Sequence, residues 1–87
     1  MKAVFHLKRA ADAGNSYAQY QLGKIYLEED TKNIPAAIQY LTLAAKQKNE
    51  FAAYRLGKLY LAGEELPKNT ELALHYLKMA ADTGNQY

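Results

Sequence analysis

Apolar residues recur at intervals of three and four along most of the chain, in five segments separated by short polar turns. This spacing is typical of helices that bury one face, because an α-helix completes a turn in about 3.6 residues. Asn15, Asn33 and Asn69 suit helix N-caps, and glycines suited to C-caps follow several segments. The pattern predicts an all-α fold, with helices over residues 2–13, 16–28, 34–47, 50–62 and from 70 to the Gly84-Asn85 pair.

Two of these helices are near-copies of each other. Residues 17–27 and 51–61 are identical at seven of eleven aligned positions. An Ala-Ala pair at 10–11 recurs at 44–45 and at 80–81, so the period is 34 (44 − 10) and then 36 (80 − 44). With the copied helices named A and the others B, the order is B-A-B-A-B. A helix pair repeated at this period indicates stacked copies of one unit.

Composition sets limits on the function. The chain has 87 residues, enough for one small domain, and a net charge of +2, too mild to favour nucleic acid or an anionic membrane. The absence of Cys excludes disulfides and thiolate metal sites. The first residues include Lys8 and Arg9 and form neither a signal peptide nor a membrane span. A cytoplasmic location is favoured for this segment.

No pattern of catalytic or metal-binding residues stands out. His6 and His75 occupy different repeat positions, and neither has a His or carboxylate four residues on. No G-x-S-x-G motif surrounds Ser16 or a threonine. We expect a protein that is not an enzyme and has no catalytic residue, cofactor, metal or small-molecule substrate.

The motif Leu-Gly-x-x-Tyr-Leu on A helices and Tyr-Leu-x-x-Ala-Ala on B helices resembles the Sel-one-like repeat, a relative of the tetratricopeptide repeat. The resemblance covers essentially the whole chain. Its residues are Leu22, Gly23, Tyr26, Leu27, Tyr40, Leu41, Ala44, Ala45, Leu56, Gly57, Tyr60, Leu61, Gly63, Tyr76, Leu77, Ala80 and Ala81. Two positions depart from it. Lys48 replaces the turn glycine, which should lower stability if that turn keeps a left-handed residue, and His6 stands where Tyr40 and Tyr76 stand.

The resemblance implies a right-handed superhelix of antiparallel helix pairs that serves as a scaffold or adaptor for protein partners. It divides the single repeat domain, 1–87, into a B helix of a preceding repeat (1–15), two full repeats (16–49 and 50–85) and the start of another (86–87). We interpret the chain as a fragment of a longer array, of a kind widespread in bacteria. Two alternatives stay open, an accessory region of a plasmid-mobilisation (relaxase-type) or other nucleic-acid-associated protein, and an architectural spacer.

Each A helix is expected to pack on two faces and to leave a third free. Mid-helix glycines at equivalent positions favour close helix packing over ligand contact. Tyrosines in fixed register beside leucines favour half-buried rings with a hydrogen-bonded hydroxyl over base stacking. The packed positions of the first copy are Ala18, Leu22, Ile25 and Tyr26 on one face and Tyr20, Gly23 and Leu27 on the other. Those of the second copy are Ala52, Leu56, Leu59 and Tyr60, and Tyr54, Gly57 and Leu61.

The remaining positions form the free stripe, which is Tyr17, Gln21, Lys24 and Glu28 in the first copy and Phe51, Arg55, Lys58 and Ala62 in the second. The resemblance implies that A helices line a concave surface. We therefore predict that the free stripe binds a protein or peptide, with Lys24, Arg55 and Lys58 suited to an acidic segment. An ordinary solvated face is the alternative. Nucleic acid is not expected to bind this segment, nor a membrane. End-to-end self-association is expected, because neither end resembles a polar capping repeat.

Overall fold

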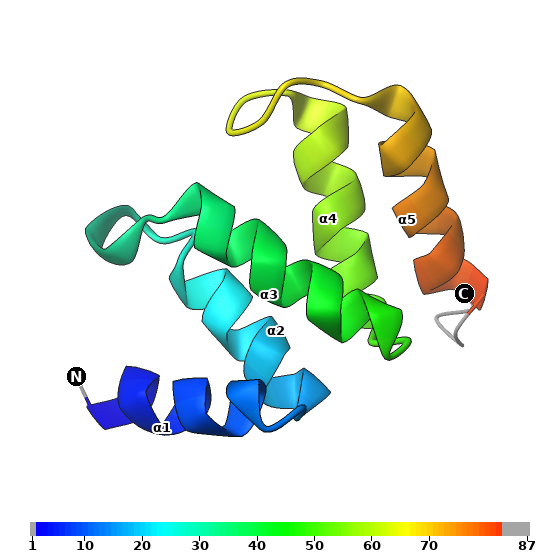
Figure 1. Cartoon of the computed structure of the whole chain (residues 1–87). Coiled ribbons are helices and arrows are strands. Elements are labelled where there is room, and N and C mark those ends of the chain that lie inside the picture. The colour runs from blue at the N-terminus through cyan, green and yellow to red at the C-terminus, as the bar shows by residue number, and fades with distance from the viewer. Residues whose placement is uncertain (1, 83–87) are drawn as a thin grey trace.

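The computed structural model describes residues 2–82, with side chains from residue 4 on, and this part of the chain is helical (Figure 1). Its elements are α1 (Lys2–Asp12), α2 (Ser16–Ile25), the short 3₁₀ helix η1 (Glu29–Thr31), α3 (Ile34–Lys46), α4 (Glu50–Ala62) and α5 (Thr70–Asp82). The predicted all-α fold and its five α-helices are confirmed over these residues. The expected closure at Gly84-Asn85 and the start of a further repeat at 86–87 lie outside them.

Helices α2 to α5 begin in the same way, because an asparagine side chain caps each of them. Its Oδ1 accepts a hydrogen bond from the backbone N–H three residues on, at 2.9 to 3.2 Å. This satisfies one of the first-turn N–H groups that have no partner inside the helix. The caps are Asn15, Asn33, Asn49 and Asn69, three of which the sequence pattern predicts by name.

The two B-to-A turns share a backbone conformation but not a residue type. Gly14 has φ 102° and Lys48, its equivalent, has φ 65°. In both turns the next asparagine N–H donates to a carbonyl five residues back, Ala10 in the first turn and Ala44 in the second. This is the Schellman closure, which needs a left-handed residue before the asparagine. Lys48 therefore holds a conformation that is costly for a residue with a Cβ.

The prediction that the first A helix extends to Glu28 is wrong, because α2 ends at Ile25. The hydroxyl of Thr31 donates to the Ile25 carbonyl. The Asn33 N–H donates to the Tyr26 carbonyl at 2.8 Å. The Ile25 carbonyl would otherwise accept from the next helical turn, so this bond from the loop ends α2. The bond to Tyr26 recurs in the second repeat, from the Asn69 N–H to the Tyr60 carbonyl, where the helix is longer. Glu28 has extended backbone angles (φ −75°, ψ 151°) beyond the helix and is not part of a helical stripe.

Consecutive α-helices pack against one another, so their order in space follows their order in the sequence (Figure 1). Within each repeat the A and B helices approach closely at a buried glycine. A Cβ added at Gly23 would lie 2.5 Å from Leu41 Cγ, and one added at Gly57 would lie 2.6 Å from Leu77 Cγ. The packing interpretation of these glycines is confirmed, since a leucine occupies the space of the absent side chain.

Burial agrees with the predicted faces in the first copy but not fully in the second. Tyr20 and Leu27 pack against the core that α3, α4 and α5 form. Their equivalents Tyr54 and Leu61 are 48% and 45% exposed, so their predicted burial is wrong. On α5, Leu74 and Ala81 are exposed as well. In each case the equivalent residue one repeat earlier is covered by a following helix.

Two polar residues of the first repeat, Tyr40 and Gln19, form hydrogen bonds to α1. The Tyr40 hydroxyl donates to Asp12 at 3.2 Å and accepts from Lys8 at 3.4 Å, and this second bond raises the pKa of Lys8. Gln19, which is 3% exposed, donates to the Ala11 carbonyl and accepts from Gln47, both at 3.0 Å. The predicted polar partner of a tyrosine hydroxyl is thus confirmed for Tyr40. The sequence pattern gives no sign of the buried Gln19.

Candidate partner-binding surface

The free stripe has an exposed aromatic residue at the start of each A helix. Tyr17 is 65% exposed and Phe51 58% exposed. Phe51 also has a packing role, since its ring lies 5.8 Å from that of Tyr20, centroid to centroid. Gln21 is half-buried on α2, whereas Glu28 lies outside the helix. The first copy therefore supplies a shorter stripe than predicted.

The lysines of the stripe are held over tyrosine rings in both copies. Lys24 Nζ lies 5.3 Å from the Tyr20 ring centroid, and Lys58 Nζ lies 5.4 Å from that of Tyr54. A cation over an aromatic face contributes about 0.5–1 kcal/mol at an exposed site. The contact directs each ammonium group along its helix surface.

Three residues of the second copy, Arg55, Lys58 and Ala62, line a groove of about 260 Å³. We call it the α4 groove. Its apolar part comes from α4 and from Leu27, which follows α2 in the preceding repeat, and its lining includes both cations and carboxylates. The full lining is Leu27, Tyr54, Arg55, Lys58, Leu59, Ala62, Glu64 and Glu65.

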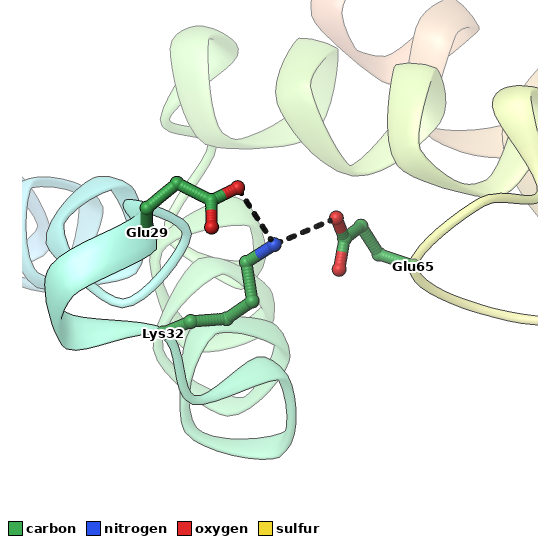
Figure 2. Close-up of polar contacts among 3 residues, drawn as sticks. All are labelled: Glu29, Lys32 and Glu65. Atoms are coloured by element: carbon green, nitrogen blue, oxygen red, sulfur yellow. Dashed lines mark hydrogen bonds and ion pairs between the residues drawn. The ribbon is translucent and has the colours of Figure 1, made fainter.

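An ion pair between loops holds one carboxylate of this rim. Lys32, in the first A-to-B loop, contacts Glu65 in the second loop at 3.1 Å and Glu29 at 3.5 Å (Figure 2). The bond to Glu65, with a further contribution from Glu29, raises the pKa of Lys32. Lys32 thus joins equivalent loops of consecutive repeats and offsets part of the negative charge beside the groove.

Sequence reasoning missed five of the eight residues that line the α4 groove. The periodicity places Leu27, Tyr54 and Leu59 on packed faces, and Glu64 and Glu65 lie in the second loop. The doubled Glu64-Glu65 pair, next to the two residues that lengthen the second repeat, is the signal that could have indicated a loop over α4. Tyr17 and Phe51 were assigned to the stripe, and neither lines this groove.

Paired tyrosines close the other side of each A helix. Tyr26 stacks on Tyr40 with ring centroids 6.2 Å apart, and Tyr60 stacks on Tyr76 at 6.1 Å. Burial raises the pKa of the Tyr60 hydroxyl, and the neighbouring Tyr76 adds to the shift. These rings face one another inside a repeat, so they do not offer a platform on which bases could stack.

The described part of the chain shows neither a membrane-spanning helix nor a cluster of metal-binding side chains. Between residues 2 and 82, no helix has the length and hydropathy needed to cross a bilayer. In the same range, no three His, Asp or Glu side chains are grouped so that they could hold a metal ion.

Comparison with known families identifies the repeat. The profile of the Sel1 repeat matches three times, over residues 1–15, 16–49 and 51–85. No curated protein matched the chain. Sel1 repeats are non-catalytic modules that in general mediate protein–protein interactions. Because the matches cover most of the sequence and the structure has the paired helices that its repeats predict, the chain belongs to the Sel1 repeat family.

Proposed function

We propose that this chain is an adaptor module that binds an extended protein segment in the α4 groove. The observation that carries the proposal is the combination of an apolar floor with the guanidinium of Arg55, which makes no ion pair with any residue between 2 and 82. We take the repeat units as 16–49 and 50–85. The groove then lies on the A helix of the second unit, beside the end of the A helix of the first.

The lining residues suggest the chemistry of the segment. Arg55 can bind a carboxylate through two parallel hydrogen bonds, and Lys58 adds a second positive charge. Leu27, Leu59 and Ala62 suit an apolar side chain next to that carboxylate. The opposite rim is acidic, so a second carboxylate there would be repelled. We therefore favour a segment with one acidic residue beside an apolar one over a strongly acidic segment.

A peptide titration tests the proposal. A labelled peptide with a Leu-Asp-Leu core between glycine and serine residues should bind, and its Leu-Asn-Leu counterpart should bind several-fold more weakly. Arg55→Ala should weaken binding of the Asp peptide roughly two- to fivefold, the range expected for one exposed ion pair. Arg55→Lys should recover only part of the loss, because an ammonium group lacks the planar fork of arginine.

Lys68→Ala is the matched control. Lys68 is an exposed lysine of the second A-to-B loop, and it does not line the α4 groove. Equal binding by Arg55→Ala and the unchanged protein would contradict the assignment to the α4 groove. Oligonucleotide titrations at two salt concentrations address the nucleic-acid alternative, which fails if nothing binds at low salt. If neither peptide nor oligonucleotide binds, the architectural spacer is the better interpretation.

A further inference from the structure

A second groove lies on the B helices, between the C-terminal halves of α3 and α5, and it shares no residue with the α4 groove. We call it the α3–α5 groove, and its volume is about 560 Å³. Buried Ala45 and half-buried Met79 supply apolar surface. The full lining is Ala45, Lys46, Lys48, His75, Lys78, Met79 and Asp82.

The charged side chains of this groove are mostly cationic. Lys46, Lys48 and Lys78 against Asp82 give a formal charge of +2 (3 − 1, His75 neutral), as large as that of the whole chain. All four charged side chains are exposed. None of them forms an ion pair within residues 2–82. Three lysines around one groove repel one another, so the arrangement favours a bound anion.

This charge belongs to one repeat and is not a property of the fold. Subtracting the repeat offsets of 34 and 36 gives the equivalent positions on α1, α3 and the turn between α1 and α2. Their only formal charges are Asp12 (46 − 34) and Lys46 (82 − 36), which sum to zero. At the position equivalent to Lys78 stands Thr42 (78 − 36). The positive charge of the α3–α5 groove is therefore not a feature that every pair of B helices shares, and the repeat fold does not explain it.

The backbone at Lys48 is the second, independent observation. The residue equivalent to Lys48 is a glycine one repeat earlier, at Gly14 (48 − 34). It is also a glycine one repeat later in the sequence, at Gly84 (48 + 36). Lys48 keeps the left-handed conformation with φ 65°, which glycine adopts at lower cost. Residues held in a costly backbone conformation are concentrated at functional sites. A lysine here lowers stability and adds positive charge to the α3–α5 groove.

We propose that the α3–α5 groove binds an acidic segment of a protein partner. Lys46, Lys48 and Lys78 surround the groove and pair with carboxylates on either side of the segment. Met79 and Ala45 contact an apolar side chain between those carboxylates. Ala45 and Met79 suit an aliphatic side chain of a peptide, whereas the bases of nucleic acid stack best on Phe, Tyr or Trp rings, and none of these lines the groove. The chain would then contact partners on two separate faces.

The test measures fluorescence anisotropy of a labelled peptide with the core Glu-Glu-Leu-Glu-Glu at low and at physiological salt. The 87-residue chain should bind it, and the peptide with Gln for each Glu should not bind. Lys46→Ala combined with Lys78→Ala should weaken binding roughly tenfold, since each exposed ion pair contributes a factor of roughly two to five.

Lys48→Gly separates function from folding. It should weaken peptide binding roughly two- to fivefold and at the same time raise the melting temperature, because glycine relieves the left-handed backbone. A variant that merely unfolds would lower both. Lys68→Ala, outside both grooves, should leave affinity unchanged.

Three results would overturn the proposal. The first is that the peptide does not bind at low salt, and the second is that the Lys46 and Lys78 double variant binds it with unchanged affinity. The third is that an oligonucleotide or an anionic lipid vesicle binds more tightly than the peptide. Loss of this binding in Arg55→Ala but not in the double variant would assign the peptide to the α4 groove. Failure of one groove is therefore distinguishable from failure of the other.

Discussion

Gly23 and Gly57 show how one residue type sets the distance between helices. In a helix interior glycine is about 1 kcal/mol less favourable than alanine. Both positions are nevertheless glycine because the leucine of the facing B helix fills the space, Leu41 in one repeat and Leu77 in the next. At Gly57 the Ala73 carbonyl oxygen adds a backbone contact, 3.1 Å from the position of an added Cβ.

Gly57→Ala should therefore destabilise the protein, even though alanine is the better helix former. Overpacking a tight contact costs about 1–3 kcal/mol, and the gain in helix propensity offsets about 1 kcal/mol of that. We expect a net loss of up to about 2 kcal/mol in the free energy of unfolding, measured by urea denaturation. Gly23→Ala should be less harmful, because its close neighbours are side-chain atoms of Leu41. A net gain in stability at Gly57 would contradict this packing interpretation.

At the scale of the elements, one tyrosine joins two B helices. The Tyr40 hydroxyl on α3 bonds to Asp12 and Lys8 on α1. Tyr40→Phe removes both bonds and keeps the stacked ring, so we expect a loss of about 0.5–1 kcal/mol in unfolding free energy. Tyr76→Phe is the matched control. Its ring stacks in the same way, but its hydroxyl makes no hydrogen bond with residues 2–82. Equal effects of the two substitutions would show that the hydroxyl contacts do not contribute.

The two A-to-B loops are joined by Lys32 and Glu65 (Figure 2). Lys32→Met should increase hydrogen exchange of the backbone amides in both loops, and added salt should reduce the difference from the unchanged protein. The pKa of Lys32 is raised above its ordinary value of 10.5, first by the bond to Glu65. The contribution of the contact to stability should thus be complete at neutral pH and be lost as pH rises through that raised pKa. Exchange that is insensitive to Lys32→Met would contradict the joining role.

At the scale of the whole molecule, each repeat covers part of the one before it. Tyr20 is packed against Phe51 of the following A helix, whereas its equivalent Tyr54 is exposed. Tyr17, the equivalent of Phe51, is exposed at the other end of the described chain. The Tyr54 face of one copy could therefore contact the Tyr17 face of another, as Tyr20 contacts Phe51 internally.

We expect this chain to associate end to end as its concentration rises. Head-to-tail contacts use two different surfaces of each copy, so a further copy can always be added and growth beyond a dimer is expected. Sedimentation velocity across a concentration series should show increasing mass. Tyr54→Glu with Leu61→Glu should reduce the association, because charges replace the apolar contact. A monomer at every concentration would contradict the prediction.

Helices, caps and repeat units could be predicted from the sequence because each depends on local features. Asn15 and Asn69 act within one helical turn, and the spacing of Ala-Ala pairs sets the period. The end of α2 could not be predicted, because the Thr31 hydroxyl reaches back from the loop to the Ile25 carbonyl, which a longer helix would use.

Tyr20 and Tyr54 show the limit most clearly. They are the same residue at the same repeat position, yet one is packed and the other lines a groove. The sequence determined which residues are equivalent and which face of each helix is apolar. Only the tertiary structure decided which of those apolar residues a neighbouring repeat covers, and which lie beside cations from another element. The physical reason is that burial depends on contact between helices, whereas periodicity describes a single helix.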